Sequence, residues 1–270
     1  PQDMGTPVQA GTQLRPQLPR RAGKFPAFRP EPFKNPRALD AEGGLAAVDN
    51  DTREKAVFLK DLGVNFNYAP VLDMSGSPET FIFDRTYSDD PRKTADYART
   101  VVTAMNDCRL IGSIKHFPGY GDNVDTHTLV AHDDRSMEQF MQKDLLPFRA
   151  GIDAGAPVVM VAHNIVSCMD PDCPASLSPA VHTLLRKELG FEGLIITDSL
   201  DMNAIVQYTG EQAAAVQAVL CGNDMLCCSS YEKQMPALVE AVRNGTVSLD
   251  RIKASVRKIL ELKLRMGIIP

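Results

Sequence analysis

The sequence predicts an α/β fold of the TIM-type (β/α) barrel class, and three observations lead to it. From about residue 37, apolar runs typical of buried strands alternate with amphipathic helical segments, which indicates a parallel sheet. Nearly every run ends in ionisable or hydrogen-bonding residues, as in barrel enzymes, which take catalytic groups from the C-terminal ends of many strands. No GxGxxG or P-loop motif follows any run, which disfavours an open doubly wound sheet.

Expected strands and helices alternate along the chain. The strand candidates are residues 64–72, 110–117, 156–163, 193–200 and 223–230, with a weaker one before the LDAEGG stretch at 39–44. The helical patterns cover 51–62, 91–107, 136–154, 178–189, 211–221, 232–244 and 248–265. Gly190 follows one of these patterns and marks its end, because glycine readily adopts the conformation that stops a helix.

The chain is short for a complete barrel. Only a brief span separates Gly44 from the helix that leads to the first strong strand, and no long apolar run precedes LDAEGG. We therefore expect a barrel that is incomplete or that has lost segments near its N-terminus. Residues 1–36 are rich in proline and arginine without sustained periodicity, so we expect an extended or poorly ordered arm there. The barrel domain is expected at 37–270.

Composition excludes several classes of protein. The chain has 270 residues, 44% of them hydrophobic, a net charge of −5 and a pI of about 5.6. This balance suits a soluble globular protein and argues against nucleic acid as a partner. No apolar run approaches the length of a membrane-spanning helix, so no such segment is expected. We expect a monomer.

Six cysteines are present without a CxxC pair, so a structural zinc site is not expected. We expect buried thiols at most of these positions. Cys168 and Cys173 flank a short loop, and a disulfide there is an open alternative that would suit an exported protein. Together with the Pro/Arg-rich lead-in, this pair favours an extracytoplasmic location over the cytoplasm, although reduced buried thiols elsewhere fit the cytoplasm.

The stretch KHFPGYGDNVDTH carries the first candidate catalytic residues. In a loop, Asp125 can place its carboxylate against the imidazole of His127, orienting the ring and raising its pKa. Such a histidine can act as a general acid and base. Taken alone, the pattern is more often a solvated polar loop. Gly119 and Gly121 fit a loop that must bend.

Further candidates stand at the ends of strands. Asp198 should project from a buried strand as a nucleophile, base or metal ligand, or else cap the following helix, with Ser199 as the rival cap. Lys115 and His116 are adjacent, so on a regular strand one would face the barrel mouth while the other braces it. His163 is either a core histidine or a site residue. No ligand pair such as HExxH is present, so no metal site is expected.

These residues fall in sequence blocks that resemble a known family. The blocks occur in the order LDAEGG, NYAPVLDM, FDRTYSDDP, KHFPGYGD followed by DTH, VVMVAH, PASLSP, LRKELGFEGLIITDSLDM and CGNDML. Over roughly residues 37–265 the chain resembles the catalytic domain of glycoside hydrolase family 3. Its separate Asp-x-His loop is similar to that of the β-N-acetylglucosaminidase branch.

The resemblance implies a role for each candidate. Asp198 matches the catalytic nucleophile, His127 the acid/base and Asp125 its orienting partner. The residues that match sugar-holding or site-lining positions are Asp40, Arg85, Lys115, His116, Met160 and His163. The implied reaction is retaining, exo-acting release of terminal N-acetylglucosamine through a covalent glycosyl-enzyme, without a metal or organic cofactor. The implied substrates are small saccharides or muropeptides, of cell-wall or chitin type.

Three features depart from the family pattern. Tyr120 stands where KHFPG is usually followed by histidine, Leu45 where EGG is usually followed by arginine, and the segment before LDAEGG is not the expected apolar strand. Two other functions stay open. One is another β-glycosidase of the family, of β-glucosidase or β-xylosidase type, and the other is a non-catalytic sugar-binding relic. Intact Asp198, Asp125 and His127 argue against the relic.

Overall fold

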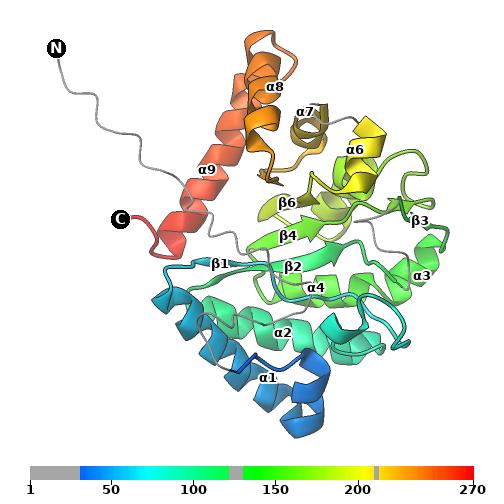
Figure 1. Cartoon of the computed structure of the whole chain (residues 1–270), viewed down its shortest axis with the longest axis vertical. Helices are drawn as coiled ribbons and strands as arrows, with labels where there is room; N and C mark the ends of the chain where they lie inside the picture. The colour runs from blue at the N-terminus through cyan, green and yellow to red at the C-terminus, as the bar shows by residue number, and fades with distance from the viewer. Residues whose placement is uncertain (1–30, 122–129, 210–212) are drawn as a thin grey trace.

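The computed structural model describes residues 31–121, 130–209 and 213–270 (Figure 1). A five-stranded parallel sheet forms the centre of this part of the chain. Its strands are β1 (Phe66–Asn67), β2 (Ile111–Phe117), β4 (Val158–Val161), β6 (Leu194–Ser199) and β7 (Met225–Cys227). They lie side by side in that order, and every neighbouring pair is parallel.

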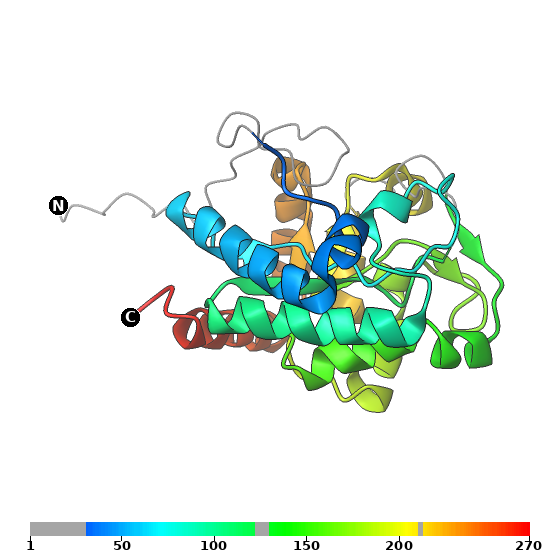
Figure 2. The ribbon, with the colours of Figure 1, turned by 90° about the horizontal axis from the view of Figure 1, so that it is seen from below.

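This strand order decides between the two parallel architectures. A doubly wound sheet reverses its strand order at a switch point, whereas here the order in the sheet follows the order along the chain. The helices α1 (Pro36–Asp61), α2 (Pro91–Asp107) and α4 (Leu145–Asp153) accordingly cover one and the same face (Figure 2). Because β1 and β7 remain edges, the described residues form a half-barrel and not a closed barrel. The α/β barrel prediction is confirmed to that extent.

Both faces of the sheet are buried. On the helical face, Phe117 of β2 and Phe148 of α4 are fully buried and meet edge to face, with ring centroids 5.2 Å apart. On the opposite face, Met160 and Ile196 belong to an apolar cluster that α9 (Leu249–Arg265) covers through Leu262. Strands buried on both sides read as near-continuous apolar runs, which is why the sequence located them.

The remaining elements make the connections. They are η1 (Phe83–Arg85), β3 (His132–Asp133), α3 (Met137–Gln142), β5 (Ile165–Val166), η2 (Ala175–Leu177), α5 (Pro179–Thr183), η3 (Leu184–Glu188), α6 (Asn203–Thr209), α7 (Ala213–Cys221) and α8 (Tyr231–Arg243). β3 and β5 pair as a small separate parallel sheet. The sequence did not predict this sheet, because strands of two residues carry too little periodicity to be recognised. It also missed α6 and the break between α3 and α4.

Capping residues explain the helix ends that were predicted well. Asp90 accepts hydrogen bonds from the backbone nitrogens of Arg92 and Lys93 at 2.7 and 3.1 Å, so α2 begins where the pattern indicated. Ser248 caps α9 in the same way, through the nitrogen of Arg251. Gly190, which was predicted to end a helix, follows η3 with a φ of 66°. That prediction is confirmed.

The weak strand expected before LDAEGG is wrong, because residues 36–61 are helical. Asn35 caps this helix by accepting a hydrogen bond from the nitrogen of Ala38 at 2.8 Å, and a proline occupies the first turn. Gly43 and Gly44 depart from helical geometry, so α1 consists of two helical segments that meet at a kink. Asp40 therefore lies on a helix and not at the end of a strand. Most of the predicted arm, residues 1–30, lies outside the described residues.

Candidate active site

The C-terminal edge of the sheet gathers the polar residues predicted at the strand ends. Lys115 and His116 end β2, His163 follows β4, and Asp198 ends β6, and these three strands are neighbours. Parallel strands present their carboxyl ends at one edge. The structure brings all four residues together, since the other three lie close enough to Asp198 to influence its pKa.

Asp73 is a fully buried carboxylate that organises this edge. His116 donates to it from the backbone nitrogen at 3.1 Å and from Nδ1 at 2.6 Å, and Tyr120 donates from its backbone nitrogen at 2.8 Å. Burial works to raise the pKa of Asp73, but the His116 ring, the Tyr120 hydrogen bond and the charge of Arg85 lower it below its usual value. The ionised carboxylate thus ties the end of β2 to the segment that follows β1.

Arg85 determines the protonation state of His116. Its Nη2 lies 3.3 Å from Nε2 of the ring. Because a guanidinium only donates, Nε2 must accept, and the ring proton sits on Nδ1 facing Asp73. Burial lowers the pKa of His116, and the charges of Arg85 and Lys115 also lower it, against the attraction of Asp73. We therefore assign a neutral ring to His116.

Asp198 is a half-buried carboxylate at the end of β6. Burial works to raise its pKa. The charge of Lys115 and a 2.7 Å hydrogen bond from the backbone nitrogen of Ser199 lower it below the usual value. Asp198 is therefore ionised at neutral pH. The first helix after it, α6, begins only at Asn203, so Asp198 does not cap that helix.

Lys115 is a cation of reduced basicity beside this carboxylate. Burial and the charge of Arg85 lower the pKa of Lys115 to about 8, against the attraction of Asp198 and Asp73. The amine is therefore protonated at neutral pH and loses its charge a little above it.

The strand is irregular where Lys115 and His116 lie, and both residues influence the pKa of Asp198. The pairing of β2 with β4 shifts register between Ile114 and Phe117. An irregularity of this kind re-aims the side chains within it.

His163 braces the backbone beside Asp198. The ring is fully buried, with Nδ1 2.7 Å from Oγ of Ser176 and Nε2 2.9 Å from the carbonyl oxygen of Ser199. Because a carbonyl only accepts, Nε2 carries the proton and donates to Ser199. Met160, in contrast, is buried in the apolar cluster under α9. Both residues support the strand ends from within the fold.

The bend after β2 requires its glycines. Gly119 has a φ of 126°, and a Cβ added there would lie only 2.5 Å from Oδ1 of Asp144. Gly121 has a φ of 58°, so the bend predicted at both glycines is confirmed. Tyr120 between them is buried, and its ring packs edge-on against Phe81 with centroids 5.2 Å apart. This departure from the family pattern therefore fills the base of the loop.

Besides Met160, three predicted site residues are not placed in this group. Asp125 and His127 lie outside the described residues. Asp40 lies on α1, where it accepts a hydrogen bond from the hydroxyl of Tyr87 at 2.6 Å. The strand end on which its expected position rested does not exist.

Two residues that the sequence analysis left unassigned do reach the group. The ring of Tyr68 lies 5.8 Å from Nζ of Lys115, and Cys227 pairs in register with Ser199, next to Asp198. Their position in the strand candidates at 64–72 and 223–230 could have indicated them. They were not recognised as site residues because neither side chain is charged.

All six cysteines belong to the described part of the chain and are free thiols. The disulfide alternative for Cys168 and Cys173 is therefore wrong. Burial raises the pKa of Cys221 to about 12 and that of Cys227 to about 11, as expected of buried thiols. Within the described ranges, no group of three or more His, Cys, Asp or Glu side chains is placed to hold a metal ion. No helix there is both long and apolar enough to cross a membrane.

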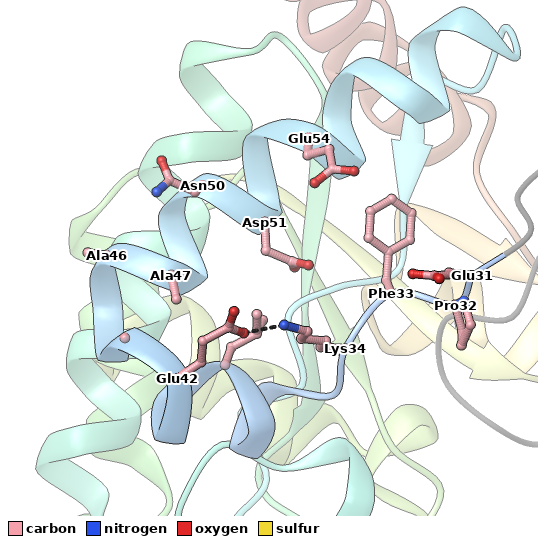
Figure 3. Close-up of a pocket in the computed structure, with 12 residues that line it drawn as sticks. Glu31, Pro32, Phe33, Lys34, Glu42, Ala46, Ala47, Asn50, Asp51 and Glu54 are labelled. Atoms are coloured by element: carbon pink, nitrogen blue, oxygen red, sulfur yellow. Dashed lines mark hydrogen bonds and ion pairs between the residues drawn. The ribbon is translucent and has the colours of Figure 1, made fainter.

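A separate pocket of about 560 Å³ lies between residues 31–34 and α1 (Figure 3). Its lining includes the carboxylates of Glu42, Asp51 and Glu54, and Lys34 pairs with Glu42. None of the strand-end residues described above lines it. We therefore assign the chemistry to the strand ends and not to this pocket.

Comparison with known proteins agrees with this assignment. Residues 23–262 match the Glycosyl hydrolase family 3 N terminal domain. A beta-hexosaminidase from Methylococcus capsulatus is 31% identical over 258 residues, which cover 92% of this chain and 77% of the relative. A beta-hexosaminidase from Xanthomonas campestris is 37% identical over 168 residues, which cover 62% of this chain and 50% of the relative. The structure of a glycoside hydrolase family 3 beta-N-acetylglucosaminidase from Paenibacillus sp. matches with a TM-score of 0.83 at 35% identity, covering 88% of this chain and 48% of that one.

The fold and the site define a barrel-type hydrolase with an ionised carboxylate at a strand end. The chain belongs to glycosyl hydrolase family 3, as the resemblance in its sequence predicted. Its class is therefore glycoside hydrolase. The chain spans about half the length of the Xanthomonas relative and of the Paenibacillus structure.

The Asp73 network leads to a prediction about stability. Asp73→Ala should lower the free energy of unfolding by about 3–5 kcal/mol, because it leaves the buried donors of His116 and Tyr120 without their acceptor. Glu79→Ala, at an exposed carboxylate six residues further along, is the matched control and should change it by less than about 0.5 kcal/mol. Urea denaturation of the three proteins measures the difference. Equal stability of the two variants would contradict the role given to Asp73.

Proposed function

We propose that the chain is a retaining, exo-acting β-N-acetylglucosaminidase that releases terminal N-acetylglucosamine through a covalent glycosyl-enzyme. The observation that carries this proposal is Asp198, an ionised carboxylate at a strand end with the cation of Lys115 beside it. The relatives named beta-hexosaminidase and the Paenibacillus beta-N-acetylglucosaminidase support the choice of sugar.

Asp198 supplies the nucleophile. Its carboxylate attacks the anomeric carbon while the bond to the leaving oxygen breaks, and an ester between sugar and enzyme results. The hydrogen bond from His163 to the carbonyl of Ser199 holds the backbone beside it, so the carboxylate is positioned before the sugar binds. Lys115, His116 and Arg85 provide the polar groups that hold the sugar hydroxyls. Asp40, which the resemblance implies as a further sugar-holding residue, lies on α1.

His127 supplies the proton and Asp125 orients its ring. In the first half of the reaction, protonated His127 donates to the leaving oxygen. In the second half, it takes a proton from the water that hydrolyses the ester. Histidine suits both steps because its ordinary pKa lies near neutral pH. The support is the family's Asp-x-His pattern, which follows the bend of Gly119 and Gly121 in the sequence.

Turnover of aryl glycosides tests the proposal directly. We expect the 4-nitrophenyl β-N-acetylglucosaminide to be cleaved faster than the β-glucoside and the β-xyloside, with the β-anomer of the sugar as the first product. Preference for the glucoside or xyloside would favour another β-glycosidase, and sugar binding without turnover would favour a relic. Product analysis on GlcNAc-MurNAc and on chitobiose then separates muropeptides from chitin fragments as the substrate.

The acid role of His127 predicts a dependence on the leaving group. His127→Ala should slow hydrolysis of chitobiose by about 10² to 10⁴-fold, the usual contribution of a general acid. The same variant should form the glycosyl-enzyme from an activated dinitrophenyl glycoside at a rate close to that of the wild type, because this leaving group departs without a proton. Single-turnover kinetics on both substrates measure the gap. If both reactions slow equally, His127 is not the acid.

The reduced basicity of Lys115 predicts a pH dependence. With the activated glycoside, kcat/KM should fall as the pH rises through about 8, because Lys115 then loses the charge that faces Asp198 and the sugar. Lys115→Arg keeps its charge and should move this fall to higher pH. Lys253→Arg, at a side chain 65% exposed, is the matched control. If kcat/KM of Lys115→Arg falls at the same pH as that of the wild type, Lys115 does not cause this pH dependence.

A further inference from the structure

Tyr68 and Cys227 meet beside Asp198, although they come from opposite edges of the sheet. Tyr68 directly follows β1, and Cys227 is the last residue of β7. Each side chain lies close enough to the other to influence its pKa. The contact therefore spans the side on which the described sheet stays open. No role in the proposed reaction has been given to either residue.

The pairing of β6 with β7 puts the thiol next to the carboxylate. Cys227 lies opposite Ser199, its nitrogen donates to Oγ1 of Thr197 at 3.1 Å, and its carbonyl accepts from the nitrogen of Leu200 at 2.8 Å. These contacts fall on both sides of Asp198 in the sequence. Burial and the charge of Asp198 raise the pKa of Cys227 to about 11, so the thiol is neutral at pH 7.

Tyr68 presents an aromatic face at the same place. Its ring packs edge-on against Phe66 with centroids 4.9 Å apart, Nζ of Lys115 lies 5.8 Å from it, and the residue is 41% exposed. Burial of its hydroxyl, with Cys227 and Asp198 nearby, raises the pKa of Tyr68, so the hydroxyl keeps its proton. An exposed ring with a polar tip suits the C–H face and the hydroxyls of a pyranose.

Resting on the glycosidase function above, we propose that Tyr68 and Cys227 form one wall of the sugar site, and that alkylation of Cys227 blocks the binding of the sugar. The ligand of this wall is a neutral pyranose that lies between the Tyr68 ring and Asp198. Neither residue reacts in hydrolysis. Both set the shape of the site around the nucleophile.

Iodoacetamide is the probe, because it is small and uncharged. The thiol loses its proton to the buffer, and the sulfur then displaces iodide from carbon, so that a thioether forms. Cys228 is the matched internal control. It is the neighbour of Cys227 and packs against a different apolar cluster, which contains Leu200 and Ile205.

The experiment measures alkylation of each cysteine by peptide mass spectrometry, with and without N-acetylglucosamine, together with residual turnover. At a sugar concentration about ten times its Kd, labelling of Cys227 should slow about tenfold, because about a tenth of the molecules remain free. Labelling of Cys228 should not change. Turnover should be lost in proportion to the labelling of Cys227. Iodoacetamide should therefore not reduce the turnover of Cys227→Ser, whereas it should reduce the turnover of Cys228→Ser.

The outcomes separate this proposal from the function it rests on. Protection requires binding and not turnover, so protected Cys227 in a chain without turnover supports the wall and contradicts the hydrolase. Two outcomes would contradict the proposed wall. One is normal turnover in a chain whose Cys227 the sugar does not protect, and the other is full activity after Cys227 has been alkylated.

A second variant tests the proximity of the two side chains. Tyr68→Phe keeps the ring but removes the hydroxyl, which works to lower the pKa of Cys227. The pKa of Cys227 should therefore rise, and alkylation at a fixed pH below 9 should become slower. Labelling at the wild-type rate or faster would contradict the contact. A purely structural role of Tyr68 would not move this rate in the predicted direction.

Discussion

The buried carboxylate of Asp73 is the contact on which the rest of the site depends. It accepts from the backbone and the ring of His116 and from the backbone of Tyr120, so one side chain sets the end of β2 and the start of the loop after it. An ionised group is held inside the fold only where such donors replace water. The same contact directs Nε2 of His116 toward Arg85. The strand end, the bend and the polar cluster are thus one unit.

Charge balance explains why Asp198 differs from Asp73, although both are ionised. Asp73 accepts three hydrogen bonds from donors within the fold. Asp198 receives one short backbone hydrogen bond, and the cation of Lys115 lies beside it. The Asp198 carboxylate is therefore ionised, and no close bidentate partner among the described residues occupies its oxygens. That is the condition under which a carboxylate can serve as a nucleophile.

Much of this arrangement could be predicted from the sequence, for identifiable reasons. The strands at 110–117, 156–163 and 193–200 are buried on both faces, and their polar ends stand out against apolar runs. The weak strand expected before LDAEGG is absent, because Asn35 and a following proline start a helix there. Tyr68 and Cys227 could not be found from the sequence. Their importance comes from a contact between the two edges of the sheet, and only the fold creates that contact.

The most direct test of the central claim is to trap the glycosyl-enzyme with 5-fluoro-N-acetylglucosaminyl fluoride and to locate the adduct by peptide mass spectrometry. The fluorine at C5 slows both steps because it destabilises the positively charged transition state, and the fluoride leaving group lets the ester accumulate. The account predicts one sugar per chain, bound to Asp198, and no adduct in Asp198→Ala. An adduct on another carboxylate, or hydrolysis that proceeds with inversion and without any adduct, would contradict it.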